Sequence, residues 1–510
     1  MSARSHSGRA ASRFSLAMSL RLSNQTLRLL PTNVARPTYD RAATKIGVAH
    51  IGPGAFHRAH QAVFLDDLLR HDSAWGISAI ALQSTRARDA LGPQDGFFSL
   101  TTLGGSSSIR VIGSIKEVIA AQLERERALN RLANQSTLVI TVTVTEKGYC
   151  LNAQGDLDIS NPGVRSDLER ARAPQSLVGT LVESLRRRKA NGLRAPVIVS
   201  CDNLASNGRL LARAVCQFAG EIDAELARWI ANEVRFPSTM VDCITPAADE
   251  AFLARVHKSL GLQDRGAVQR EEFAQWVIED SLGEWSAQWG GAGVTLVKDV
   301  APFEQAKLRL LNGAHSALAY IGLLRGFETV AAAMADPPLA NFIARLLRED
   351  IAPTVAGSEI ELESYIAMIE RRFRSPEIDH KLAQIAWDGS QKLPIRILST
   401  VQEALRARQP IARLSIAIAA WMHFIRNAAR SGAAIVDPFE AKLREIGQRC
   451  NGDEDDVEHF ISLKSVFSEL TFEARFISSL KVAYSVLAAP GRPHASIDFA
   501  EIDHRLGEGA

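Results

Sequence analysis

Three polar residues with catalytic chemistry fall on one apolar stretch of the chain, from Lys307 to His315. On a helix of about 100° per residue, Asn312 lies roughly 140° around from Lys307, and His315 lies roughly 80° around. Glu304, three residues before Lys307, falls on the same arc. An amine that exchanges a proton, an amide and an imidazole on one wall suit proton transfer at an alcohol or ketone oxygen.

An amphipathic helix with a solvated polar face is the alternative, and the stretch taken alone favours it. The apolar neighbours argue against it, because they would bury the helix on most sides: Leu308, Leu310, Leu311, Ala314, Ala317, Leu318 and Ala319. Buried polar groups need partners or a chemical role. The sequence therefore predicts a buried helix that carries catalytic groups.

A strand, a glycine-rich turn and a helix are predicted near the start of the chain. The strand 45–51 runs into the turn Gly52-Pro53-Gly54, and a helix follows over 61–70. This layout is typical of a dinucleotide-binding fold, in which a pyrophosphate lies over the turn. His57 stands where the usual pattern has a third glycine. A tight turn that binds no ligand therefore stays an alternative.

The second predicted strand, 75–82, ends without the Asp or Glu that usually binds the adenosine ribose hydroxyls. The residues near that place are Ser84, Thr85, Arg86 and Arg88. An Arg there can accommodate a 2′-phosphate. These residues leave the choice between NAD and NADP open, and we expect NAD as the cofactor, with NADP as the alternative.

Two later strands end in polar motifs. The predicted strand 137–144 stops at Thr145-Glu146-Lys147, and the strand 195–200 stops at Cys201-Asp202-Asn203. In open α/β sheets, ligands bind beyond the carboxyl ends of the strands. Lys147, Asp202 and Asn203 are therefore expected where a nicotinamide and a substrate would meet.

A length of 510 residues exceeds one compact core and predicts two or three domains, and the periodicity predicts an α/β protein. We expect a Rossmann-like dinucleotide-binding domain at 45–298 and a mostly α-helical substrate-binding domain at 299–510. Within the second, helical periodicity is clear in 338–349, 359–374, 378–387 and 411–426.

A basic tail is expected over residues 1–44, with six Arg and no acidic residue before Asp40. We expect it to be disordered, with an organelle transit peptide or a start codon upstream of a true start at Met18 as alternatives.

Charge, hydropathy and cysteine usage exclude several classes of protein. A net charge of +2 implies no large basic face, which argues against nucleic acid as a partner. No apolar run reaches the roughly 18 residues that a transmembrane helix needs. Five scattered Cys, without a Cys-x-x-Cys pair or a Cys/His cluster, favour a reduced cytoplasmic protein without a metal.

Seven segments carry a resemblance to the long-chain mannitol dehydrogenase family. They are His50–Gln61, Val144–Tyr149, Ser200–Asn203, Phe236–Asp242, Gln275–Asp280, Lys307–His315 and Asp388–Lys392, in the family's order. The Lys-x-x-x-x-Asn-Gly-x-His helix and the Ser-Cys-Asp-Asn strand end are specific to it. The resemblance implies a nicotinamide-binding domain, a helical domain, an active site to which both contribute, and no metal.

Within that family, the closer likeness is to the fructuronate reductase branch, through Thr145–Cys150, Trp387–Pro394 and Arg396. It implies interconversion of D-fructuronate and D-mannonate by a monomer or small homo-oligomer. Mannitol 2-dehydrogenase and tagaturonate reductase are alternatives. The alternative outside enzymes is a nucleotide-binding regulatory protein, which would have no reason to keep the polar helix.

The resemblance also implies a role for each candidate residue. Lys307 matches the general acid/base, and Asn203 and Asn312 match the amides that hold the reacting oxygen. His315 matches a residue that orients the substrate, and Glu304 matches a carboxylate that relays protons to solvent. The expected cofactor-binding residues are Gly52, Gly54, Ala55, Phe56, Thr145, Glu146 and Lys147, and the expected substrate-binding residues are Asp242, Lys392 and Arg396. One departure is Cys243, at a position where the family commonly has an Arg.

Overall fold

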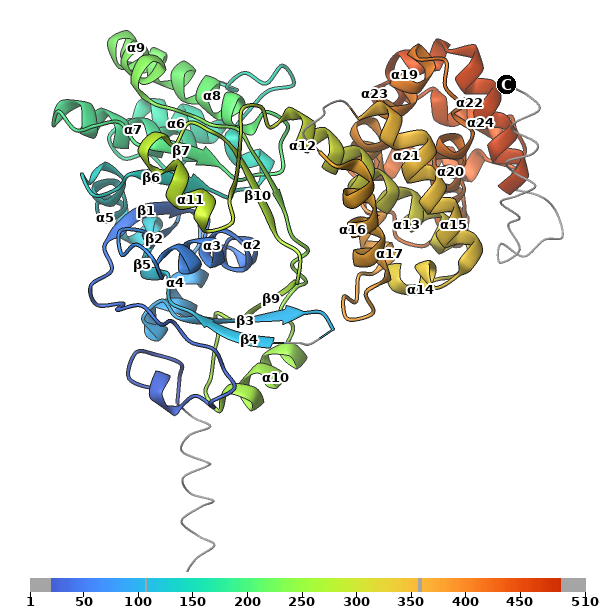
Figure 1. The fold of residues 1–510 in the computed structure, drawn as a ribbon. Coiled ribbons are helices and arrows are strands. Elements are labelled where there is room, and N and C mark those ends of the chain that lie inside the picture. Colours follow the sequence, from blue (N-terminus) through green and yellow to red (C-terminus); the bar gives the residue numbers. More distant parts are fainter. Residues whose placement is uncertain (1–19, 106–107, 356–359, 488–510) are drawn as a thin grey trace, which may run out of the picture. The chain divides into compact units, whose positions relative to one another are not determined.

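The computed structural model describes residues 20–105, 108–355 and 360–487, which form two units that divide between Ala301 and Pro302 (Figure 1). The first unit contains all of the described strands, and the second is built from helices. None of the described helices is both long enough and apolar enough to cross a lipid bilayer.

A parallel sheet of five strands organises the first unit, in the order β5-β2-β1-β6-β7. Its strands are β1 (Ile46–Ile51), β2 (Gly76–Ala81), β5 (Ile115–Ala120), β6 (Val139–Val142) and β7 (Val197–Ser200). The four strands predicted from the sequence are all present, shortened by one or two residues at some ends. The strand order reverses around β1, which pairs with β2 on one side and with β6 on the other. Ligands of open α/β sheets bind at such a switch point.

Helices cover both faces of this sheet, and the alternation of side chains along β1 shows why. Val48 packs in a cluster with α3 (Gln61–Leu68), whereas Ala49 and Ile51 pack in a second cluster with α7 (Leu177–Ala190) and α8 (Asn207–Ile222). Because both faces are buried, the strands are almost continuously apolar, and all six residues of β2 are buried.

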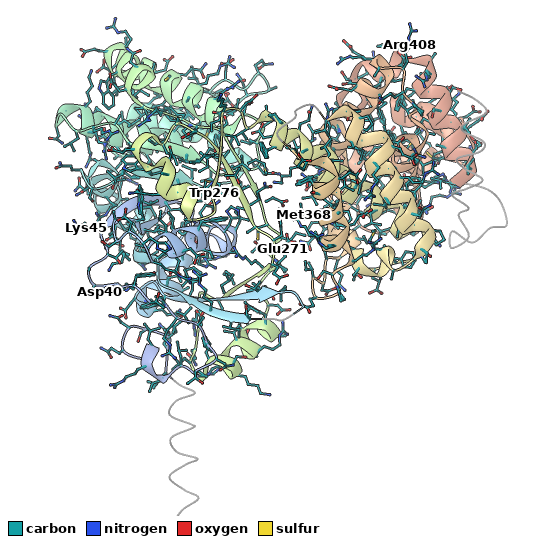
Figure 2. All side chains as sticks on the ribbon, viewed as in Figure 1. Asp40, Lys45, Glu271, Trp276, Met368 and Arg408 are labelled. Carbon is teal, nitrogen blue, oxygen red and sulfur yellow. The ribbon has the colours of Figure 1, made fainter. Side chains whose placement is uncertain are left out.

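Two small sheets complete the first unit. One has the order β4-β3-β9, and the other has the order β11-β10-β8. The strands are β3 (Phe98–Leu103), β4 (Ser108–Ile112), β8 (Thr239–Asp242), β9 (Val268–Glu271), β10 (Gln275–Glu279) and β11 (Thr295–Val297). Trp276 of β10, labelled in Figure 2, is fully buried and packs edge-on against His60 with ring centroids 6.0 Å apart. Through this contact, β10 packs the second small sheet against the segment that follows the glycine-rich turn.

The described part of the expected N-terminal tail, residues 20–44, differs from the prediction of disorder. Leu22, Leu30 and Val34 are 0–5% exposed and pack in a hydrophobic cluster with Phe97 and Val256. The prediction of disorder is based on the basic composition of this segment and does not take these apolar residues into account. Residues 1–19, to which the transit-peptide and start-codon alternatives apply, lie outside the described residues.

The second unit packs around two buried helices, α13 (Ala314–Leu324) and α20 (Ala412–Ser431). The mostly α-helical prediction for this part of the chain is confirmed. The helix predicted over 378–387 is wrong at its start, because only α17 (Leu382–Ile385) is helical there. Lys381 instead makes an antiparallel bridge with Thr329. Other helices of the unit are α12 (Ala301–Ala306), α15 (Pro337–Arg345), α16 (Leu362–Arg374), α18 (Gly389–Leu393), α19 (Ser399–Arg406), α21 (Glu440–Arg449) and α24 (Ala474–Leu487).

Three segments of this unit are π-helical, namely Lys307–Gly313, Leu346–Ile351 and Pro394–Leu398. The predicted α-helix from Lys307 is therefore continuous into α13 but wider over its first turns. The angles expected for an α-helix do not apply there, because π-helical hydrogen bonds join residues i and i+5. The segment from Gly389 to Leu398, which carries two of the expected substrate-binding cations, is helical, and its wider π turn accommodates Pro394, which cannot donate a backbone hydrogen bond.

Candidate active site

A cavity of about 1060 Å³ opens at the carboxyl edge of the parallel sheet, and every residue that lines it belongs to the first unit. The turn after β1, the end of β2 and the segment after β6 form its walls. The residues expected from the sequence to bind a cofactor are largely present on these walls, as Gly52, Gly54, Ala55, Thr145 and Lys147. Phe56 does not line the cavity and stacks on His60 instead, with ring centroids 5.0 Å apart. The side chain of Glu146 lies outside the described residues.

The two glycines of the turn meet different steric demands. Gly52 has a φ of +97°, and a Cβ there would lie 1.9 Å from the carbonyl oxygen of Thr143. No other residue fits that position without moving β6. At Gly54, a Cβ would meet only the carbonyl oxygen of Gly52, at 3.9 Å. Gly54 therefore leaves room on the cavity side, as the close approach of a ligand to the backbone requires.

A pair of buried histidines supports this turn from below. The rings of His50 and His57 stack with centroids 3.3 Å apart, and both residues are fully buried. His50 Nδ1 lies 2.8 Å from the hydroxyl of Thr141, and Nε2 lies 2.9 Å from that of Thr143. Burial lowers the pKa of His50 to about 3 and that of His57 well below its usual range, so both rings are neutral. His57 thus fills the place of the third glycine as a packing residue.

The charged side chains that line the cavity are all cationic: Arg58, Arg86, Lys147 and Arg265. Arg58 is fixed by donating to the carbonyl oxygen of Pro53 at 2.8 Å and to that of Gly266 at 3.2 Å. No Asp or Glu belongs to the described lining. The volume, the open glycine and the positive walls fit an elongated anionic ligand such as a nicotinamide dinucleotide.

The polar loop after β7 is locked by hydrogen bonds that the sequence did not predict. The Tyr149 hydroxyl, 2.5 Å from both Asp202 Oδ2 and Ser200 Oγ, joins the segment after β6 to the end of β7. Burial, followed by the charge of Asp202, raises the pKa of Tyr149 well above its usual value, so the hydroxyl keeps its proton. Only the Thr-Glu-Lys-Gly-Tyr motif itself pointed to this residue.

Asn207 also fixes the conformation of this loop through hydrogen bonds. Its amide nitrogen donates to the carbonyl oxygens of Asp202 and Thr239, each at 2.9 Å, and its oxygen accepts the N–H of Thr239 at 2.9 Å. Because both ends of the amide are used, Asn207 serves the structure of the loop. Asn203, four residues earlier, is exposed and so remains accessible to a ligand.

Asp242 is the last residue of β8 and is 4% exposed. The next residue, Cys243, is a largely buried thiol whose pKa burial raises to about 12, so it is neutral. The guanidinium of Arg270 acts electrostatically on this thiol. A cation is therefore present beside Cys243, although the family's Arg is missing from that position.

In the second unit, the π-helix carries Lys307 and Asn312, and α13 begins with Ala314 and His315. Lys307, Asn312 and Glu304 are half-buried, and His315 is 7% exposed. Leu310, Leu311 and Ala314 are buried, so the predicted buried helix is confirmed. Glu304, Lys307 and Asn312 are therefore partly accessible to solvent, while the apolar side of the same helix is packed in the core.

His315 lies within a group of basic side chains. Its ring stacks on Phe373 and meets His380 edge-on, each with centroids 4.7 Å apart. Burial lowers its pKa well below the usual value, and the four groups that lower it further are all basic: His380, Arg396, Arg372 and Lys392. We call these five residues the basic cluster. The neutral imidazole leaves its Nε2, which is buried and without a hydrogen-bond partner in the described structure, to contact a ligand.

The two cations predicted from the sequence are both members of the basic cluster. Arg396 Nη1 donates to the hydroxyl of Ser316 at 3.2 Å, while its buried Nε has no hydrogen-bond partner among the described residues. Lys392 Nζ donates to the carbonyl oxygen of Ile385 at 3.2 Å. Arg396 forms no ion pair with an acidic residue in the described structure, so its charge is available to an anionic ligand.

The other two basic members were missed by the sequence reasoning. Arg372 belongs to α16, is 7% exposed and donates to the sulfur of Met368 at 3.6 Å (Met368 is labelled in Figure 2). His380 follows the turn after α16, and its backbone N–H donates to the carbonyl oxygen of Ile378. Both lie far from Lys307 in sequence, and no spacing rule relates them to it.

Within the described ranges, no three His, Cys, Asp or Glu side chains are placed to hold a metal ion. The described residues do offer proton-transfer groups and cations. They suit polarisation of a carbonyl oxygen and recognition of an anionic group.

Two family models together match nearly the whole chain. The one described as the mannitol dehydrogenase Rossmann domain matches residues 46–290, and the mannitol dehydrogenase C-terminal domain matches residues 299–488. Among similar proteins, D-mannonate oxidoreductase of Escherichia coli (strain K12) is 39% identical over 469 residues, covering 90% of this chain and 96% of that protein.

Two solved structures share this fold over the length of the chain. The ternary complex of Pseudomonas fluorescens mannitol 2-dehydrogenase with NAD and D-mannitol is 31% identical, with a TM-score of 0.81, and covers 96% of this chain and 100% of that one. A D-sorbitol dehydrogenase in substrate-free form is 30% identical, with a TM-score of 0.85, and covers 94% of this chain and 100% of that one.

Proposed function

The chain belongs to the mannitol dehydrogenase family of oxidoreductases, and we propose that within this family it interconverts a keto sugar acid and its alcohol, D-fructuronate and D-mannonate. The basic cluster is the observation that carries this proposal. Arg396 and Lys392, which lie beside a buried neutral histidine, repel one another, and a bound carboxylate would relieve that repulsion. A neutral sugar offers no such compensation.

Asp388 and Asp437 are the acidic groups that face Lys392, and they offset part of this positive charge. Asp437 is already engaged, because it accepts hydrogen bonds from the backbone and hydroxyl of Ser390 at 2.8 and 2.5 Å. Arg396 is left as the best-placed donor to a substrate carboxylate, which a guanidinium can bind through two parallel hydrogen bonds.

Lys307 serves in this proposal as the general acid that protonates the carbonyl oxygen, and as the base in the reverse direction. The amides of Asn203 and Asn312 donate to that oxygen while negative charge develops on it. A nicotinamide supplies the hydride for ketone reduction and accepts it in alcohol oxidation. Reduction therefore consumes one hydride and one proton for each ketone.

The remaining candidate residues have supporting roles. Glu304, three residues before Lys307, passes the proton between Lys307 and solvent. Neutral His315 directs its free Nε2 to a substrate hydroxyl, and Asp242 accepts from a distal hydroxyl. The walls of the cavity, with Gly52, Gly54, Ala55, Thr145 and Lys147, hold the dinucleotide.

Reduction of fructose to mannitol is the second candidate, because the mannitol 2-dehydrogenase of the P. fluorescens complex shares the fold over the whole chain. Reduction of tagaturonate is a third, and it would use the same carboxylate contact. A regulatory protein that only binds a nucleotide would need neither the Lys307 helix nor the basic cluster.

The test measures kcat/KM for fructuronate, tagaturonate and fructose with NADH and with NADPH, in the wild type and in Arg396→Ala. We expect the wild type to prefer a keto acid. Arg396→Ala should lose about 2 kcal/mol, roughly 30-fold, in kcat/KM for that acid, with little change for fructose. Equal losses for both substrates, or a wild type that prefers fructose, would move the assignment to mannitol 2-dehydrogenase.

A further inference from the structure

We propose that the cavity selects NADP(H) over NAD(H), with Arg86 binding the 2′-phosphate and the hydroxyl of Ser84 donating to it. The proposal rests on the proposed function, because it requires a nicotinamide dinucleotide in the cavity. It concerns the cofactor phosphate and is independent of which sugar is reduced.

The end of β2 is where the adenosine ribose of a dinucleotide lies in folds of this kind. β2 ends at Ala81, and Gln83, Ser84 and Arg86 line the cavity directly after it. NAD-specific sites place a carboxylate here to accept hydrogen bonds from the ribose hydroxyls, and that carboxylate repels a 2′-phosphate. The described lining of the cavity has no carboxylate, so nothing in it opposes the additional negative charge.

Two neighbouring arginines differ in whether their charge is available. Arg88 pairs with Asp89 at 2.8 Å and does not line the cavity. Hydrogen bonds from Thr85 and Arg88 lower the pKa of Asp89, which keeps that carboxylate ionised and Arg88 compensated. Arg86 is exposed, lines the cavity and forms no ion pair or side-chain hydrogen bond within the described part of the chain. Its guanidinium is therefore available to a ligand that occupies this end of the cavity.

The loop that carries Ser84 is held in place. Gln83 Nε2 donates to the carbonyl oxygen of Gln175 at 2.9 Å, and Gln175 also lines the cavity. Ser84 Oγ accepts the backbone N–H of Arg86 at 3.2 Å, which leaves the hydroxyl proton to be donated. A hydroxyl and a guanidinium two residues apart form a fitting pair of donors for a phosphate.

The pyrophosphate of a bound dinucleotide would be met by another cation, Arg58, so Arg86 is not needed for that contact. Arg58 is tied by its hydrogen bond to Pro53, within the glycine-rich turn where a pyrophosphate lies. Removal of Arg86 should therefore affect a dinucleotide with a 2′-phosphate and spare one without it.

The experiment measures dissociation constants by calorimetry for NADPH, NADH, adenosine 2′,5′-bisphosphate and adenosine 5′-monophosphate. The variants are Arg86→Ala and Ser84→Ala, with Arg88→Ala as the matched control. We expect the wild type to bind the bisphosphate at least about tenfold more tightly than the monophosphate. Arg86→Ala should abolish that difference and weaken NADPH by about the same factor, while NADH changes less than about twofold. Ser84→Ala should show a smaller loss in the same direction, and Arg88→Ala none.

A wild type that binds NADH more tightly than NADPH would overturn the proposal. An Arg86→Ala variant that weakens both dinucleotides equally would also overturn it. If the wild type reduces a keto sugar with NADH but does not discriminate the phosphate, only this inference fails. If neither dinucleotide binds, the proposed function fails with it.

Discussion

A Cβ added at Gly313 would lie 2.7 Å from the carbonyl oxygen of Arg396. Two π-helical segments, Lys307–Gly313 and Pro394–Leu398, are therefore packed backbone to backbone at this point. The first carries the candidate acid and one amide, and the second carries a candidate carboxylate-binding cation. Their contact fixes the spacing between proton transfer and substrate recognition within the second unit. The glycine of the Asn-Gly pair is thus required by packing.

Gly313→Ala should destabilise the protein by about 1–3 kcal/mol, because the added methyl group meets a backbone atom that cannot rotate away. It should also raise KM for the keto acid by displacing Arg396. The matched control is Gly220→Ala in α8, where a Cβ meets nothing within 4 Å and should stabilise the helix slightly. Thermal unfolding and steady-state kinetics measure both effects, and a Gly313→Ala variant as stable as the control would contradict the contact.

The parallel strands, the glycine turn and the buried helix from Lys307 could be predicted, because each depends on local pattern. Gly52 adopts the positive φ that a glycine in a tight turn allows. Along β1, successive apolar side chains pack into the clusters on the two faces of the sheet. The end of β6 also predicted that Lys147 would lie at the ligand-binding edge of the sheet, and Lys147 lines the cavity, whereas Asp202 and Asn203 are not among its lining residues. These features use information from a few neighbouring residues.

Arg372, His380 and Tyr149 could not be predicted as site residues, because only tertiary packing brings them to their partners. In the sequence, Arg372 is one of several charged residues on a predicted helix. Only the tertiary structure buries its side chain, to 7% exposure. The π-helical turns were missed for a related reason. Two of these segments pack against each other where Gly313 approaches the backbone of Arg396, a contact between residues far apart in sequence that helix propensities do not describe.

Lys307→Ala should lower kcat by a factor of about 10² to 10⁴ while leaving NAD(P)H binding nearly unchanged, because the general acid is lost and the cavity lies in the other unit. Stopped-flow kinetics measures the chemical step, and fluorescence titration measures cofactor binding. Partial recovery by added primary amines would support the role further. A variant with near-normal kcat from pH 6 to 10 would show that Lys307 does not transfer the proton.

Asn203→Ala and Asn312→Ala should each lower kcat by roughly 10² to 10³, because each removes a donor to the developing alkoxide. If both amides act on the same oxygen, the double variant should lose less than the product of the two single losses. Asn207→Ala is a contrasting variant, since its buried amide locks the loop and its loss should lower thermal stability. Unchanged kcat with a raised KM would instead assign Asn203 and Asn312 to ordinary substrate binding.

Lys392 predicts a pH dependence that separates acidic from neutral substrates. Burial, followed by the charge of Arg396, lowers its pKa to about 8, although Asp388 and Asp437 act in the opposite direction. The ammonium that would attract a carboxylate is therefore present below pH 8 and is lost as the pH rises through that value. A neutral sugar gains little from this charge. The ratio of kcat/KM for fructuronate to kcat/KM for fructose should accordingly fall above pH 8.

The ratio removes any pH dependence that the reactions of the two substrates share. We expect the ratio to fall by about tenfold between pH 7 and pH 10, the size of one charge-assisted contact. Lys392→Arg should flatten the profile, because a guanidinium keeps its charge over this range. Lys392→Met should give the low ratio at every pH. A wild-type ratio that does not change with pH, or a Lys392→Arg ratio that still falls, would remove Lys392 from the carboxylate site.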